Sequence, residues 1–279
     1  VGSEMCIRDR VILYRPTGES GDFEKANFPI GVEGGKTSTC PTQNLMEAYD
    51  MKDGTPFVWN NQSNPYDNRD PRMKYTIVCN EMKWPVDPVE IWEGGTNGLP
   101  LQNATTTGYY LKKYVNNTIS FEAGSTVTKK QHNWVLFRYG EILLNYAEAM
   151  INAFHDPNYK DAVYNMSARE AVNQIRGRTN ISLPGFPSDI TEKDFVKRLK
   201  NERRVELAFE GHRFWDVRRW KELGQTANIY GVKITKNNEV ISYEKFLLET
   251  RAVTDNMYFY PIPNTERFKN PNLGQNPGW

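Results

Sequence analysis

Three glutamates at helical spacing are the residues of this 279-residue chain whose pattern could best carry chemistry. Glu202, Glu206 and Glu210 recur in the stretch NERRVELAFEGHRFWDVRRWKEL, so one helical face would carry all three. Two such carboxylates could lie at the separation of roughly 5–5.5 Å that a retaining glycosidase uses. The stretch can therefore be interpreted as a hydrolase site or as a set of structural ion pairs.

The arginines that surround these glutamates favour ion pairs. A general acid needs a raised pKa, whereas nearby positive charge lowers the pKa of a carboxyl group. The stretch therefore predicts no catalytic residue. Instead we predict a structural ion-pair lattice made of Glu202, Arg203, Glu206, Glu210, Arg213, Asp216 and Arg219.

Aromatic residues among neutral amides form a second pattern, on loops rich in Gly and Pro. Aromatic rings can stack on the C–H faces of sugars, and amides can pair with sugar hydroxyls. The alternative is that these rings fill gaps beneath the loops. The candidate ligand-binding residues are Trp59, Asn61, Tyr66, Trp84, Trp92 and Asn97.

Histidines and cysteines show no metal-binding pattern. His132, His155 and His212 are far apart, and the three cysteines have no C-x-x-C spacing. We therefore expect neither a metal ion nor a cofactor. The net charge of +1, without a basic block, argues against nucleic acid as a partner. No apolar run approaches the roughly 18 residues of a membrane-spanning helix.

The second half of the sequence has helical periodicity. Apolar residues repeat at three- to four-residue spacing over 138–154, and Ser167 with Glu170 has the spacing of a capping box. A third helix should begin near Thr191 and run into the glutamate stretch. Gly211 could break or kink it, which would make the residues after it a separate turn or helix. Paired amphipathic helices of this kind indicate an α-helical, repeat-like scaffold.

The first half, residues 11–131, contains mainly loops. A short helix over 42–51 is expected, with Thr42 as its cap, and the content of 74–80 and 108–115 is typical of strands. The Pro- and Asn-rich tail, 258–279, predicts an extended segment that wraps the body of the protein.

The first ten residues, VGSEMCIRDR, differ from the rest. They resemble a translated sequencing adapter, so we expect 1–10 to be a non-native tail that takes no part in the fold. Residues 11–279 then form the native portion.

Several blocks of the chain together resemble the C-terminal part of SusD/RagB-type proteins, the nutrient-binding outer-membrane lipoproteins of glycan-foraging Gram-negative bacteria. These blocks follow the family's order across residues 11–279, which is the whole native portion. They are PTQNLMEAYDMKDG, NRDPR, TTGYYLKKY, RYGEILLNYAEA, AVNQIRGRTN, ERRVELAFEGHRFWDVRRWK, YPIPNTE and NPNLGQNPGW.

The resemblance implies a mostly α-helical, SusD-like fold with tetratricopeptide-like helix pairs, a loop-rich ligand-binding face and little β-structure. It also implies a non-catalytic protein on the surface of the outer membrane, which binds oligosaccharides and delivers them to a SusC-type TonB-dependent transporter. Family members are about twice as long as this chain. The resemblance therefore places the signal peptide, the N-terminal lipid anchor and the first helix pairs in an N-terminal half that this chain lacks.

Two alternatives stay open at the level of sequence. One is a glycan-active enzyme, a glycoside hydrolase, whose acid and base would be Glu90 or Glu93 beside Trp92, with Asp67 or Asp70. The other is a peptide-binding member of the same family. No binding residue can be transferred by motif, so the candidate ligand residues rest on side-chain chemistry alone.

Overall fold

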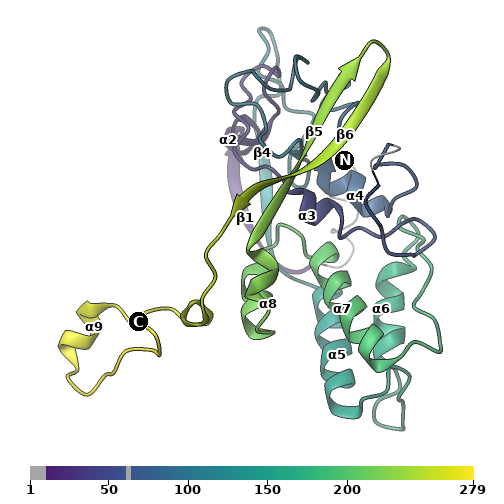
Figure 1. Cartoon of the computed structure of the whole chain (residues 1–279), viewed down its shortest axis with the longest axis vertical. Coiled ribbons are helices and arrows are strands. Elements are labelled where there is room, and N and C mark those ends of the chain that lie inside the picture. Colours follow the sequence, from purple (N-terminus) through teal and green to yellow (C-terminus); the bar gives the residue numbers. More distant parts are fainter. Residues whose placement is uncertain (1–10, 61–63) are drawn as a thin grey trace.

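A helical layer occupies one end of the molecule and a loop-rich half the other (Figure 1). The computed structural model describes residues 11–60 and 64–279, so the expected non-native tail, 1–10, lies outside the described residues. Helices account for 29% of the described residues and strands for 18%, and the strands form no closed sheet. The expected helical fold with few strands therefore holds in outline.

Three helices lie side by side in the helical layer (Figure 1): α5 (Tyr139–Phe154), α6 (Ala168–Arg176) and α7 (Glu192–Glu206). Their apolar faces meet in one buried cluster, which includes Leu144 and Phe195. The capping box of α6 is present, because Ser167 Oγ accepts from the backbone N–H of Glu170 while the Glu170 carboxylate accepts from that of Ser167. Thr191 caps α7 as expected. These helices therefore begin where the sequence places them.

The glutamate stretch does not form one continuous helix. Helix α7 ends at Glu206, and Phe209 and Gly211 both have positive φ, +61° and +83°. The chain then enters α8 (Arg213–Arg219) and a 3₁₀ turn, η1 (Leu223–Thr226). Glu210 consequently lies in the turn after α7, so the expectation that one helix carries all three glutamates is wrong for this residue.

The loop-rich half contains short elements: α2 (Asp22–Asn27), α3 (Gln43–Met46), α4 (Pro71–Thr76), β2 (Ile77–Val78) and β3 (Tyr110–Leu111). Thr42 caps α3 by accepting from Leu45 N–H, as expected, although the helix is shorter than 42–51. The strand expected over 74–80 is reduced to β2, because Asp70 caps α4 and the helix extends to Thr76. Strand β2 pairs antiparallel with β3.

Two longer antiparallel strand pairs were not predicted: β1 (Val11–Ser20) with β4 (Lys130–Arg138), and β5 (Asn228–Asn237) with β6 (Val240–Thr250). The second pair is a hairpin, and it packs Val232, Ile234 and Tyr243 into the buried cluster of the loop-rich half. Helix α7 reaches both clusters, because Val205 belongs to this one and Leu199 to the helical one.

The C-terminal tail departs from the expectation. Its elements, the 3₁₀ turn η2 (Asp255–Tyr258) and α9 (Asn264–Lys269), extend away from the body in Figure 1. No residue from 251 onward is buried, and Phe268 is 83% exposed. The tail folds on itself, since Gln275 bonds to Ile262 and Asn276 to Tyr260. Tyr260 of the tail stacks on Phe214 of α8, with 6.0 Å between ring centroids, but the tail does not wrap the body as expected.

Candidate functional site

A buried ion-pair lattice joins the helical layer to the loop-rich half. We call it the central lattice, and it consists of Glu202, Glu206 and Glu210 with Arg72, Lys113, Arg138, Arg176 and Arg178. Glu206 lies at its middle. One carboxylate oxygen accepts from Arg138 Nη1 at 2.6 Å, and the other accepts from Arg72 Nη1 at 2.9 Å and Arg178 Nη2 at 2.6 Å.

The other two glutamates extend the lattice in both directions. Glu202 accepts from Arg72 on one oxygen and from Arg176 Nη1, at 2.8 Å, on the other. Glu210 accepts from Arg138 Nε and from Lys113 Nζ, both at 2.6 Å. Arg72 and Arg138 therefore each bridge two glutamates, and Glu210 joins the lattice although it lies outside the helix.

The electrostatics of the central lattice are opposite to those of a general acid. Burial by itself raises the pKa of Glu206, but the guanidinium groups of Arg138, Arg178 and Arg72 together outweigh it and hold the pKa well below its usual range. Burial also raises the pKa of Glu202, and Arg72 and Arg176 reverse that effect. These carboxylates stay ionised at neutral pH and cannot donate a proton to a leaving group.

The cationic partners come from elements that the sequence analysis did not connect to the glutamates. Arg72 lies in the first turn of α4, where Asp70 caps the helix and also accepts from the Arg72 guanidinium at 2.7 Å. Arg138 is the last residue of β4. Both arginines lie in blocks, NRDPR and RYGEILLNYAEA, that stand far from the glutamates in sequence, and only the fold brings them together.

A second cluster of ion pairs lies beside α8. Asp216 accepts from Arg203 Nε at 2.8 Å and from Arg219 Nε at 2.9 Å. Arg219 also pairs with Glu148 of α5, which accepts from the Trp220 indole N–H at 2.8 Å. Arg203, Asp216 and Arg219 thus form ion pairs, in a cluster that shares no residue with the central lattice.

Arg213 differs from the other residues expected in the lattice. It has no carboxylate within 4.0 Å among the residues that the structure describes, and its Nη2 donates to Gln225 Oε1 at 2.8 Å. Burial lowers its pKa. Its guanidinium lines a groove between α7 and the segment after α3, so its assignment to the ion-pair lattice is corrected.

Two of the candidate tryptophans lie partly at the surface. Trp59 is half-buried and meets the ring of Phe57 edge to face, with 6.4 Å between ring centroids. Trp92 is also half-buried, and Lys236 Nζ lies over its ring, 4.3 Å from the centroid. Both rings pack against the cluster of the loop-rich half. Each ring therefore packs partly against the protein and keeps part of its surface accessible to solvent.

The remaining candidates lie deeper. Tyr66 and Trp84 are 5% and 7% exposed and belong to the buried cluster, which is the gap-filling role that the sequence left as the alternative. Asn97 is buried as well, and its amide accepts from Glu90 N–H and donates to Ile30 O. The structure gives these three side chains packing and loop-fixing contacts. Asn61 lies outside the described residues.

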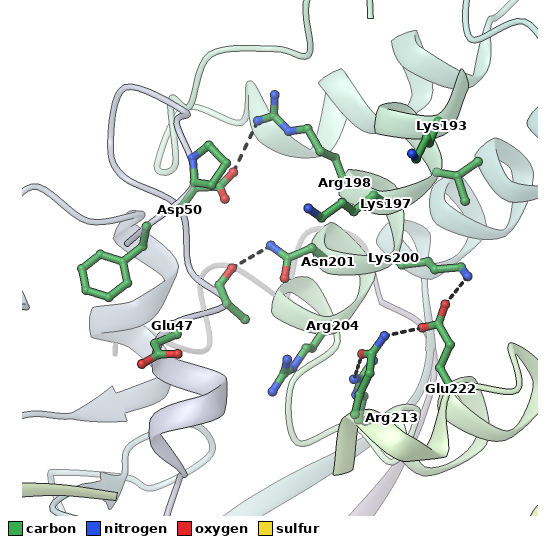
Figure 2. Close-up of a pocket in the computed structure, with 15 residues that line it drawn as sticks. Glu47, Asp50, Lys193, Lys197, Arg198, Lys200, Asn201, Arg204, Arg213 and Glu222 are labelled. Carbon is green, nitrogen blue, oxygen red and sulfur yellow. Dashed lines mark hydrogen bonds and ion pairs between the residues drawn. The ribbon is translucent and has the colours of Figure 1, made fainter. Parts of the chain in front are cut away.

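The groove lined by Arg213 has a volume of about 450 Å³ (Figure 2). Side chains from one face of α7 form one wall, and the segment that carries Glu47 and Asp50 lies opposite. Phe57, which contacts Trp59, is part of the lining. The groove therefore adjoins one of the candidate aromatic residues.

Within 11–60 and 64–279, no three His, Cys, Asp or Glu side chains gather in a way that could hold a metal ion. The same residues include no helix that is both long enough and apolar enough to cross a membrane.

Comparison with known proteins agrees with this architecture. The chain belongs to the SusD family, whose family model matches residues 15–279. Two curated relatives come from Formosa agariphila. SusD-like protein P2 is 29% identical over 163 residues, which cover 56% of this chain and 28% of the relative. SusD-like protein P38 is 37% identical over 150 residues, which cover 52% of this chain and 24% of the relative.

Two solved structures from Bacteroides fragilis share the fold. A SusD-like protein superposes with a TM-score of 0.77 at 26% identity, over 97% of this chain and 54% of that structure. A SusD-like carbohydrate-binding protein superposes with a TM-score of 0.75 at 25% identity, over 95% of this chain and 54% of that structure. This chain therefore spans about half the length of these solved structures, and its aligned part about a quarter of the curated relatives.

Proposed function

We propose that this chain belongs to a non-catalytic cell-surface protein that captures oligosaccharides. The observation that carries the proposal is the likeness, over 95% of the chain, to a SusD-like carbohydrate-binding protein. Membership of the SusD family supports the same role. Delivery to a SusC-type TonB-dependent transporter in the outer membrane extends the proposal, and it rests on the family alone.

The state of the carboxylates favours binding over hydrolysis. All three glutamates at helical spacing are held by arginine or lysine, and their pKa values are lowered. A glycoside hydrolase needs one carboxylic acid whose pKa is raised. The central lattice therefore supports a structural role for the stretch.

The alternative acid–base residues have structural partners as well. Asp70 is buried and accepts from Arg72. Glu93 pairs with Lys233 at 3.3 Å, and Glu90 accepts from the Thr96 hydroxyl at 3.1 Å. These contacts give no specific support for the enzyme hypothesis.

We assign the sugar contacts to Trp59 and Trp92, the two candidate rings with accessible surface. In this proposal Tyr66, Trp84 and Asn97 do not contact the sugar, and they stabilise the loops through buried packing and hydrogen bonds. A ring that stacks on a sugar contributes on the order of 1–2 kcal/mol, so its removal should weaken binding about tenfold.

The test is calorimetry with the purified chain against a panel of neutral and acidic oligosaccharides. Trp59→Ala and Trp92→Ala should each lower the affinity for the bound glycan about tenfold, in protein that stays folded at the temperature of the measurement. Trp134→Ala is the matched control, because Trp134 is 52% exposed on β4 and stacks on Tyr114. It should bind as the wild type does.

Three results would contradict the proposal at different points. If both loop variants bind like the wild type, the assigned rings are wrong. If no glycan of the panel binds, the function is wrong. If chromatography finds shortened products after incubation, the non-catalytic role is wrong.

A further inference from the structure

The groove between α7 and the segment after α3 carries an excess of positive charge. Its lining includes three acids, Glu47, Asp50 and Glu222, and six cations: Lys193, Lys197, Arg198, Lys200, Arg204 and Arg213. Figure 2 shows Arg198 and Arg204 pointing toward the segment that carries Glu47 and Asp50, whereas Lys200 and Arg213 lie on the side of Glu222. The lining therefore has a formal net charge of +3.

The three acids are already neutralised, partly from outside the groove. Glu47 pairs with Lys245 at 2.8 Å, and Asp50 pairs with Arg176 at 3.3 Å; neither cation lines the groove. Glu222 pairs with Lys200. The acids of the groove therefore cannot balance its remaining cations.

Four cations of the lining consequently have no carboxylate within 4.0 Å among the described residues: Lys193, Lys197, Arg204 and Arg213. Three of them, together with Lys200, recur at three- to four-residue spacing, which places them along one face of α7. The opposite face of the same helix holds Glu202 and Glu206 in the central lattice. On the buried face of α7 the glutamates are paired with cations, whereas the face toward the groove carries three cations that have no carboxylate partner among the described residues.

Arg204 is the deepest of these cations. It is half-buried, and its Nη2 donates to the backbone carbonyl of Asn44 at 2.9 Å. Burial lowers the pKa of Arg204 to about 10, and the like charge of Arg213 acts in the same direction. A desolvated guanidinium beside a second one is favourable only with a compensating negative charge. Guanidinium groups bind carboxylate and sulfate in a bidentate manner, which suits the position.

An aromatic wall continues the groove. Phe57 belongs to the lining, and its ring contacts that of Trp59, the ring assigned above to sugar contact. Phe57 is itself held by Arg69, whose guanidinium lies 3.6 Å from the ring centroid. Aromatic rings that could stack on a sugar therefore adjoin cations that could pair with an acidic group, because Phe57 lines the groove and contacts Trp59.

We propose that this groove binds the carboxylate or sulfate groups of an acidic oligosaccharide whose sugar rings extend toward Trp59. The inference rests on the proposed glycan-binding function and names the chemical class of its ligand. A net charge of +3 across the lining favours a ligand with several negative charges over a neutral one.

The experiment compares four probes by calorimetry in low salt: tetragalacturonate, a sulfated chondroitin tetrasaccharide, neutral cellotetraose and inorganic sulfate. At least one acidic tetrasaccharide should bind about tenfold or more tightly than cellotetraose and sulfate. Its affinity should fall as salt is added, because exposed charges are screened.

Variants localise the binding. The double variant Lys193→Gln/Lys197→Gln removes two exposed, unpaired cations. It should lower the affinity for the acidic tetrasaccharide about tenfold, without changing the affinity for cellotetraose. Arg204→Lys should also lower the affinity for the acidic tetrasaccharide, because lysine keeps the charge but loses the bidentate geometry. The control is Lys129→Gln/Lys130→Gln, which removes two exposed cations outside the groove and should leave binding unchanged.

The possible failures are distinguishable. If cellotetraose binds as tightly as the acidic probes, or if the two double variants have equal effects, the acidic-ligand inference is wrong while glycan binding stands. If inorganic sulfate alone binds as tightly as the tetrasaccharides, the groove is a simple anion site and the inference is also wrong. If none of the three sugars binds, both the inference and the proposed function fail.

Discussion

Each glutamate of the central lattice is a buried charge with more than one cationic partner. Glu206 illustrates the arrangement, since it is 5% exposed and accepts from three arginines. A buried ion pair adds little net stability over apolar packing, but removal of one partner leaves an uncompensated charge. Substitution of one member of the central lattice should therefore lower the free energy of unfolding strongly.

Glu206→Gln should lower the free energy of unfolding by about 3–5 kcal/mol, because it removes the negative charge that Arg72, Arg138 and Arg178 share. Glu192→Gln is a matched control on the same helix, since Glu192 makes a largely exposed pair with His155 and should change the same quantity by about 0–1 kcal/mol. Urea unfolding measures both. Equal shifts in the two variants would contradict the importance of the central lattice.

The lowered pKa values of Glu202, Glu206 and Glu210 predict a pH dependence of stability. In the unfolded chain these groups have their ordinary pKa of 4.5, whereas in the folded protein they bind protons only at lower pH. Their contribution is therefore fully present above pH 4.5 and is lost as the pH falls toward the folded pKa values.

Urea unfolding at a series of pH values tests this prediction. The free energy of unfolding should decrease below about pH 4.5 in the wild type, and the decrease should be smaller in Glu206→Gln, which lacks one of the titrating groups. A variant that loses stability with acid as steeply as the wild type would show that Glu206 does not contribute to it.

At the scale of elements, α7 organises the molecule. Val205 packs in the buried cluster of the loop-rich half, and Leu199 packs in the cluster of the helical layer. Glu202 and Glu206 of the same helix form ion pairs with Arg72 and Arg138. Its end at Glu206 and the turn at Gly211 place α8 so that Asp216 reaches Arg203. The direction of the chain after α7 therefore decides which ion pairs can form.

Gly211→Ala tests this turn. Gly211 has φ +83°, which an L-residue rarely adopts, although no atom lies within 4 Å of an added Cβ. The substitution should cost about 1 kcal/mol through backbone strain alone. Gly224→Ala is the control, because its φ lies outside this region and its Cβ position is also open. If thermal unfolding shows equal stability for the two variants, the turn does not require glycine.

At the scale of the whole molecule, the arginines connect two separate apolar clusters. Arg72 comes from the loop-rich half and Arg176 from the helical layer, and both bind Glu202. The tail beyond residue 251 contacts neither cluster through a buried residue. The two halves should therefore unfold together, while the tail opens independently.

Hydrogen exchange followed by mass spectrometry measures this difference. Amides of 255–279 should exchange quickly, and those of α5 and α7 should exchange slowest, because local opening is easiest where few apolar contacts are buried. Protection of the tail equal to that of α5 would mean that it packs on the body in solution.

The sequence by itself determined the elements that local chemistry specifies. Apolar periodicity gave α5, and the side chains of Thr42, Ser167 and Thr191 fixed where helices begin, because each cap bonds to backbone groups within three residues. These features depend on neighbours in the chain. The crowding of arginines also led to the prediction that the glutamates form ion pairs, but the cations that pair with them come from other elements.

Only the tertiary structure decided the features that depend on distant residues. Arg72 and Arg138 reach Glu206 across 134 and 68 residues of sequence, and no local pattern encodes that meeting. The burial of Tyr66 and Trp84 also depends on distant residues, because their local sequence is that of a polar surface loop. Arg213 is a third case, since it lines the groove and bonds to Gln225 instead of joining the ion-pair lattice. Side-chain type is written in the sequence, whereas burial and partnership depend on how the whole chain packs.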